Sequence, residues 1–163
     1  MPRASDCRRC AGRDETGESL CALRTLVAIF AVLALCAMPL RATVRILASP
    51  GGEVGPFLHL FEAVRDSGER VIIDGPCLSA CTLVLSIVPH DRICVTHRAI
   101  LGFHAARSID RRGRLHAEPE ASEVVLGAYP APVKEWIIHR GGLTSHVLLL
   151  RGKALRAMYR PCR

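Results

Sequence analysis

The chain has 163 residues, enough for one domain of ordinary size and too few for two. Half of the residues are hydrophobic, so we expect a packed core and not a largely disordered chain. Residues 43–163 carry 16 Lys and Arg against 11 Asp and Glu, but their few aromatic residues are scattered, which speaks against nucleic-acid binding.

The N-terminal segment contains an uncharged apolar stretch, Thr25 to Leu40, preceded by Arg24. Sixteen residues are short for a membrane span, which needs about 20, but they suit the apolar region of a secretory signal. We therefore expect residues 1–42 to form a leader and residues 43–163 to form one periplasmic or secreted domain. The alternative is an uncleaved signal anchor at 25–40, which would hold the protein to the inner membrane and would be its only membrane contact.

Short apolar runs separated by turn residues predict alternating strands and helices in the first half of this domain. The expected elements are a strand at 44–48, the turn SPGG at 49–52, a helix at 57–66, a strand at 71–74, a helix from about 79 to 87, and strands at 92–96 and 99–104. This alternation is typical of crossover units and predicts an α/β domain with a mostly parallel sheet.

The second half of the domain is expected to be helical from about residue 119. The polar run at 106–119 predicts an exposed loop, since it contains two arginines and a glycine in a row. Apolar spacing then predicts helices at 120–129 and 132–140, and further helix at 144–159 with a break near Gly152.

Three short motifs contain the parts of a serine acyl-transfer site. They are SPGG at 49–52, GPCLSACT at 75–82 and AILGFH at 99–104. Each lies at the carboxyl end of an expected strand, and these ends meet at one edge of a parallel sheet, where ligands bind. We therefore expect the three motifs to converge on one crevice.

The chemistry of acyl transfer assigns a role to each motif. A serine hydroxyl needs a base to take its proton, and the resulting oxyanion needs preorganised donors. Ser79 is the candidate nucleophile, and His104 is the candidate base. The candidate oxyanion hole consists of the backbone N–H groups of Gly51, Gly52 and Ala80. A lone serine at a helix start is more often an N-cap, so the hypothesis depends on the motifs occurring together.

The order of these motifs resembles the Clp protease/crotonase superfamily, and most closely its exported bacterial members. Those proteins read C-x-S-A-C-T, then an arginine, then G-x-H, which residues 77–82, Arg92 and residues 102–104 match. The likeness is strong over 44–104 and loose in the tail. It implies a spiral of βαβ units with a helical C-terminal tail, the roles given above for the serine and the histidine, and assembly into homo-oligomers.

One departure from that family concerns the third member of a catalytic triad. Clp peptidases orient their histidine with an aspartate from well downstream, and here no acid follows Glu135. The acids beyond the histidine, none in a matching motif, are Asp110, Glu118, Glu120, Glu123 and Glu135. We therefore expect a Ser-His dyad, with a weak or an inactive enzyme as alternatives. A Ser-Lys dyad would need Lys134 or Lys153, and neither has a supporting context.

Eight cysteines divide equally between the expected leader and the domain. An even number in an exported chain predicts one or two disulfides, with three pairings open, among Cys77, Cys81, Cys94 and Cys162. A bridge from either cysteine beside Ser79 would stiffen its loop, and structural stapling is a more common role for such a bridge than redox control. A bridge between the other two would tie the tail to the core.

The seven histidines lack metal-site spacing, so we expect no metal and no cofactor. The function we expect is an exported serine hydrolase that acts on peptide bonds, with a peptide or an ester as substrate. One alternative is a non-catalytic envelope protein that keeps the fold for binding or assembly. Another is a thioester or ester hydrolase on the same scaffold.

Overall fold

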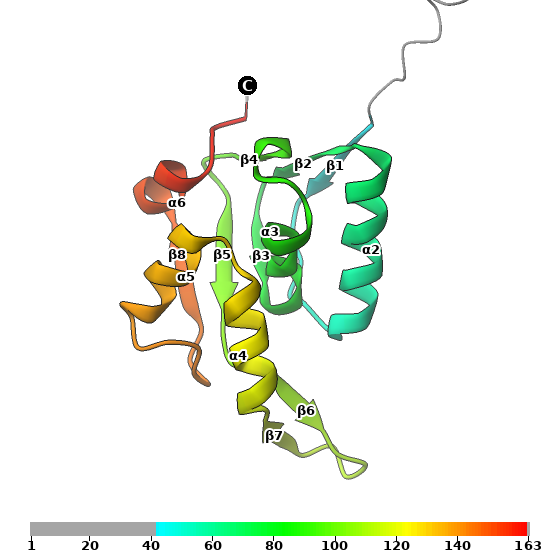
Figure 1. The fold of residues 1–163 in the computed structure, drawn as a ribbon, viewed down its shortest axis with the longest axis vertical. Coiled ribbons are helices and arrows are strands. Elements are labelled where there is room, and N and C mark those ends of the chain that lie inside the picture. Colours follow the sequence, from blue (N-terminus) through cyan, green and yellow to red (C-terminus); the bar gives the residue numbers. More distant parts are fainter. Residues whose placement is uncertain (1–41, 163) are drawn as a thin grey trace, which may run out of the picture. The chain divides into compact units, whose positions relative to one another are not determined.

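The computed structural model describes residues 42–162, and Figure 1 shows them as short strands flanked by helices. The expected leader, its apolar stretch at 25–40 and its four cysteines lie outside these residues, apart from Ala42. Between residues 42 and 162, no helix has the length and apolar character that crossing a bilayer requires.

The first sheet is parallel, with strand order β1-β2-β4. It consists of β1 (Thr43–Ile46), β2 (Arg70–Ile73) and β4 (Ile93–Val95), and helix α2 (Val54–Ser67) connects the first two strands. The side chains of Val71 and Ile73 are fully buried, as expected for the central strand of a covered parallel sheet. Strand and helix alternate here as the sequence predicted, and the mixed α/β class is confirmed.

The second sheet has the order β3-β5-β8 and mixes strand directions. It consists of β3 (Pro76–Leu78), β5 (Ile100–Phe103) and β8 (Leu148–Arg151), with β5 parallel to β3 and antiparallel to β8. Helix was expected over 144–159 with a break near Gly152; the part before the break was wrong, because 148–151 pairs as a strand with β5, whereas helix does follow from Gly152. Strand β3 was also not expected, since its three residues are too few to show a period.

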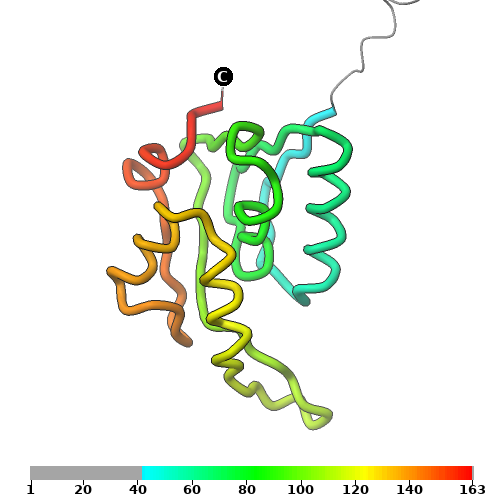
Figure 2. Tube along the Cα trace, in the orientation of Figure 1, coloured from blue at the N-terminus to red at the C-terminus, as the bar shows by residue number. Residues whose placement is uncertain are grey.

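A β-hairpin replaces the exposed loop that was expected at 106–119. Its strands, β6 (Arg107–Ile109) and β7 (Leu115–Ala117), are antiparallel and fully solvent-facing, so no apolar alternation signals them. The Asp110 carboxylate closes the turn by accepting the backbone N–H groups of Arg112 (2.8 Å) and Arg114 (2.9 Å). These bonds and the nearby His116 lower the pKa of Asp110 to about 2. Figure 2 shows the hairpin extending beyond the end of α4.

The remaining helical elements follow the predicted order, except for the 3₁₀ helix at 90–92, which was not expected. They are the 3₁₀ helix η1 (Ser79–Leu83), α3 (Val84–Ile87), the 3₁₀ helix η2 (His90–Arg92), α4 (Pro119–Ala128), α5 (Ala131–Ile138) and α6 (Gly152–Met158). The helices expected at 120–129 and 132–140 are confirmed, each shifted by one or two residues. Proline occupies the first turn of both, where its missing N–H costs nothing.

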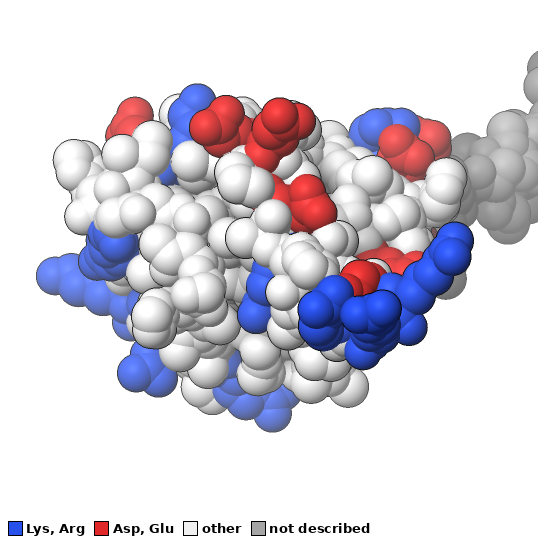
Figure 3. Space-filling model, turned by 90° about the horizontal axis from the view of Figure 1, so that it is seen from below, with Lys and Arg blue, Asp and Glu red and all other residues white. Residues whose placement is uncertain are grey.

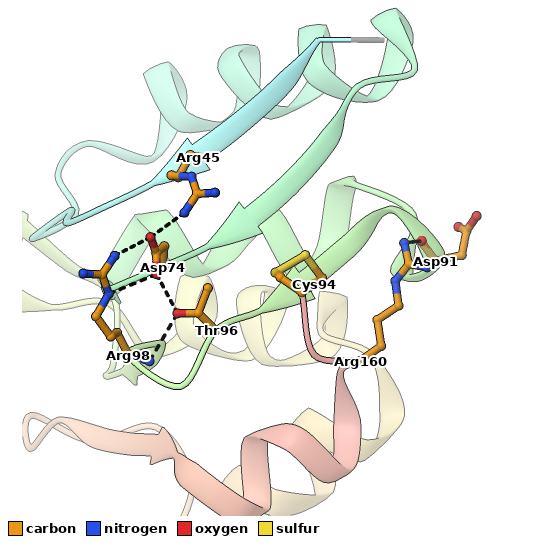
Figure 4. Close-up of a disulfide and its surroundings, with 8 residues drawn as sticks. Arg45, Asp74, Asp91, Cys94, Thr96, Arg98 and Arg160 are labelled. Atoms are coloured by element: carbon orange, nitrogen blue, oxygen red, sulfur yellow. Dashed lines mark hydrogen bonds and ion pairs between the residues drawn. A yellow bond between two sulfur atoms is a disulfide. The ribbon is translucent and has the colours of Figure 1, made fainter.

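The C-terminal segment adds to the outer edge of β4. Val95 donates its N–H to the Arg160 carbonyl (3.0 Å), and Cys162 donates its N–H to the Val95 carbonyl (3.1 Å). The Cys94–Cys162 disulfide, shown in Figure 4, fixes the same segment covalently. The sequence left three pairings open, and the structure has the one that ties the tail to the core.

Candidate functional site

Ser79 occupies a sharp turn between β3 and η1. Its φ is +54°, and it is the only residue other than glycine with a positive φ among residues 42–162. Such a conformation costs about 1–3 kcal/mol, and it persists where the surrounding structure imposes it, often at active sites. A serine on a strained strand-to-helix turn is also the arrangement that exposes the nucleophile in α/β-hydrolases.

Gly51 packs directly against this turn. A Cβ built on Gly51 would lie 2.5 Å from the Ser79 Cβ and 2.6 Å from the Leu78 carbonyl oxygen. Its φ of +85° is a second reason that only glycine fits here. The Leu78 N–H also donates to the Ser49 carbonyl (3.0 Å), so the SPGG segment runs beside β3. Two of the three motifs therefore meet, as the sequence predicted.

The three candidate oxyanion donors have different surroundings. Gly52 and Ala80 line the cavity that Ser79 lines, whereas Gly51 does not. The Gly51 N–H instead donates to the Ser49 hydroxyl (3.3 Å). Ala80 is the second residue of η1, and the first N–H groups of a helix lack an intrahelical acceptor. The geometry therefore points to the amides of Gly52 and Ala80, and it gives Gly51 a packing role.

His104 follows the last residue of β5 and is half-buried. Its Nδ1 lies 2.7 Å from the carbonyl oxygen of Ala105. A carbonyl can only accept a hydrogen bond, so Nδ1 carries the proton and Nε2 holds the lone pair. The neutral ring therefore has the tautomer that a general base needs, and within 42–162 no carboxylate hydrogen-bonds to it.

Ser79 and His104 line the same cavity, which has a volume of about 690 Å³. Within the described part of the chain, no hydrogen bond joins the serine hydroxyl to the imidazole. The cavity wall is completed by the hairpin and by α4, through Ile109, Leu115 and Val125 among others. Its size lies in the range of small-ligand sites, and its wall mixes apolar side chains with a few polar groups.

Sequence reasoning missed a buried hydrogen-bond chain beneath Ser79. The Thr82 hydroxyl donates to the Ser79 carbonyl (2.6 Å), and the Tyr129 hydroxyl lies 2.6 Å from the same Thr82 oxygen. Because the one hydroxyl proton of Thr82 is used, Tyr129 is the donor in the second bond. Burial raises the pKa of Tyr129 to about 12, so the phenol keeps its proton at neutral pH.

The sequence indicated only one of the two side chains in this set of hydrogen bonds. Thr82 stands in the motif that carries Ser79, and its position was therefore visible. Tyr129 follows the end of α4, 47 residues away, and nothing in its local sequence marks it. Its ring packs edge-on against Phe103 (centroids 5.2 Å apart), which connects the chain to β5.

Cys77 and Cys81 form a disulfide that spans Ser79. Both cysteines are buried, at 0% and 1% exposure, so the bond lies beneath the turn and not in the cavity. With Cys94–Cys162 it accounts for all four cysteines of the described residues. The disulfide prediction is therefore confirmed, and two disulfides fit a compartment outside the reducing cytoplasm.

Other candidate residues have structural surroundings in this fold. Arg92 donates to the Arg65 carbonyl at the end of α2 (2.9 Å). Lys134 and Lys153 lie outside the lining of the serine cavity. Among residues 42–162, no group of three or more His, Cys, Asp or Glu is arranged to hold a metal ion.

Charged side chains are dispersed over the face seen in Figure 3. Lys and Arg form several separate groups there, Asp and Glu lie beside some of these groups, and white surface lies between. This face therefore carries no continuous basic band of the kind that follows a nucleic-acid backbone.

Comparison with known proteins adds no family assignment. A scan against protein-family models gave no match for the chain, and a search of curated proteins gave none either. The described residues define a disulfide-bonded, mixed α/β domain with small, mostly parallel sheets.

Proposed function

We propose that the chain is an exported serine hydrolase of the Clp protease/crotonase fold that cleaves peptide bonds. One observation carries the proposal: Ser79, held at a positive φ, and His104, whose Nδ1 faces the Ala105 carbonyl, line one cavity. The order of the three motifs in the sequence supports the same conclusion. The periplasm, or the space outside the cell, is the proposed location, which agrees with two disulfides.

In the proposed reaction, the Ser79 oxygen attacks the substrate carbonyl carbon while His104 Nε2 takes the hydroxyl proton. The N–H groups of Gly52 and Ala80 stabilise the oxyanion that forms. When the C–N bond breaks, the imidazolium gives its proton to the leaving amine. Water then attacks the acyl-serine by the same route and releases the acid.

The Ala105 carbonyl takes the orienting role that an aspartate has in a triad. It fixes the tautomer of His104, but a neutral oxygen stabilises the imidazolium less than a carboxylate does. Loss of the correct aspartate in a serine protease costs about 10⁴ in turnover, so we expect a slow enzyme. The hydroxyl would approach Nε2 when substrate binds, since catalytic hydrogen bonds are often long without it.

The substrate we propose is a peptide, with an ester or thioester as the alternative on the same scaffold. The volume of about 690 Å³ and the apolar side chains from the hairpin suit a ligand with a non-polar side chain next to the reacting carbonyl. Homo-oligomers, which the family resemblance implies, are part of the proposal.

A fluorophosphonate probe tests the nucleophile, because it forms a covalent bond with an activated serine. We expect labelling of the oxidised protein, no labelling of Ser79→Ala, and labelling slowed by about 10²–10⁴ in His104→Ala. Ser108→Ala is the matched control, since Ser108 lines the same cavity but donates to Glu118 (2.6 Å). Labelling that survives in Ser79→Ala would remove the assignment.

A second candidate function is a non-catalytic envelope protein that uses the cavity for binding. It is favoured by the missing hydrogen bond between Ser79 and His104 in the described residues. An activated ester distinguishes the two candidates: a burst of product equal to the enzyme concentration supports the hydrolase. Saturable peptide binding without any burst or labelling supports the second candidate.

A further inference from the structure

A second cavity, of about 440 Å³, lies at the carboxyl ends of the first sheet. Its lining includes Arg45 from β1, Asp74 directly after β2, and Thr96 directly after β4. Open parallel sheets bind ligands at this edge. Arg98 and Arg156 also line the cavity, so three guanidinium groups surround it.

A buried carboxylate organises two of these arginines. Asp74 is 4% exposed and accepts hydrogen bonds from Arg45 Nη1 (2.6 Å), from Thr96 Oγ1 (2.7 Å), and from Nε and Nη2 of Arg98. Figure 4 shows these side chains converging on the carboxylate from two segments of the chain, β1 and the residues that follow β4. Both guanidinium groups are therefore held in place before any ligand arrives, which lowers the entropic cost of binding one.

The arginines retain donors and charge that the carboxylate does not use. A guanidinium has five N–H donors; Asp74 takes two from Arg98 and one from Arg45. Arg156 makes no side-chain hydrogen bond to any described residue, and its side chain is exposed. Three guanidinium groups against one carboxylate leave the lining with a net charge of +2 when His97 is neutral.

We propose that this cavity binds a phosphate monoester group. Arginine pairs bind phosphate through paired N–H donors, and the planar guanidinium matches its oxygens. A phosphate monoester carries about −1.5 to −2 at pH 7, which balances the net charge of the lining, whereas a carboxylate would balance half of it. The site shares no lining residue with the serine cavity, so a test of one proposal does not decide the other.

Isothermal titration of the oxidised protein with inorganic phosphate, at low ionic strength and pH 7.5, tests the site. We expect saturable binding that weakens about 10-fold or more in Arg156→Gln, since charge-assisted hydrogen bonds are the strong ones. Arg156→Gln leaves the Asp74 cluster intact, so the variant should fold. Arg111→Gln is the matched control, because it removes one exposed arginine from the hairpin turn, and its affinity should equal that of the parent.

Vesicles distinguish a lipid headgroup from a free phosphate ester. Binding to phosphatidylcholine vesicles with added phosphatidic acid, but not to phosphatidylcholine alone, would identify a lipid phosphomonoester, provided that Arg156→Gln reduces it. Phosphate binding without vesicle binding would identify a small phosphate ester. The proposal is overturned if phosphate does not bind saturably, or if Arg156→Gln and Arg111→Gln bind it as the parent does.

Discussion

Tyr129 and Thr82 are joined by a buried hydrogen bond of 2.6 Å, and the Thr82 hydroxyl in turn donates to the backbone carbonyl of Ser79. These two hydrogen bonds link the end of helix α4 to the turn that holds Ser79 at a positive φ. The side chain that supports the candidate nucleophile therefore comes from a part of the sequence that shows no catalytic motif.

Removing the Tyr129 hydroxyl should weaken both the fold and the candidate site. We expect Tyr129→Phe to lower the free energy of unfolding by about 1 kcal/mol in urea, and to slow fluorophosphonate labelling of Ser79. Tyr159→Phe is the matched control, because the buried Tyr159 hydroxyl has no partner among the described residues. That control should be neutral or slightly stabilising, and equal destabilisation of both variants would contradict the role given to Tyr129.

Gly51 should tolerate no side chain. Gly51→Ala places a methyl group 2.5 Å from the Ser79 Cβ and forces alanine into the left-handed region. We expect a loss of about 2 kcal/mol or more in urea unfolding, together with loss of labelling, since overpacking alone costs about 1–3 kcal/mol.

Gly127→Ala serves as the control for that substitution. Gly127 is exposed within α4, and a Cβ there would meet nothing within 4 Å. Because alanine favours a helix over glycine by about 0.5–1 kcal/mol, this variant should be slightly more stable than the parent. A Gly51→Ala protein as stable as Gly127→Ala would show that the turn at Ser79 has room for a methyl group.

Asp74 should make stability depend on pH. Hydrogen bonds from Arg98, Thr96 and Arg45 hold the pKa of Asp74 well below its usual value. The pKa of Asp74 in the unfolded chain is about 4, so the ionised carboxylate contributes its full stabilisation above that pH. This stabilisation is lost progressively as the pH falls towards the lower pKa of the folded state. Asp74→Asn should melt at a lower temperature than the parent at pH 7, and the gap should narrow between pH 4 and pH 2.

An exposed aspartate gives the comparison for this pH series. Asp66 pairs with its neighbour Arg65 at the surface (2.8 Å), and such pairs add little to stability. Asp66→Asn should therefore melt close to the parent at every pH. A gap for Asp74→Asn that stays constant down to pH 2 would mean that its charge is not the cause.

The sequence predicted the parallel sheet well and the second sheet poorly. Strands β1, β2 and β4 are bordered by clear turn residues and carry apolar side chains that pack into the core, so local pattern was sufficient. Strand β8 lies in an apolar run, Leu148 to Leu150, that suits a helix equally well, and only its pairing with β5 decides it. The hairpin strands bury nothing, and their turn chemistry at Asp110 was the only available signal.

The candidate site was predictable where its residues share short motifs. Ser79, Gly52, Ala80 and His104 were visible because each belongs to a short motif at or after an expected strand. The orienting partner of His104 was not, because a backbone carbonyl has no signature in the sequence. The split of roles between Gly51 and Gly52 depends on tertiary packing and was equally hidden.

The pairing of the C-terminal segment with β4 has a consequence for self-association. An unpaired strand edge is a template on which another chain can build a sheet. Here Pro161, which has no N–H to offer, faces Val95 in the added segment, and the covalent tie from Cys162 keeps that segment in place. A reducing agent would cleave this disulfide and let the C-terminal segment leave the edge of β4. A thiol-treated sample should therefore be more prone to form intermolecular β-structure than an oxidised one.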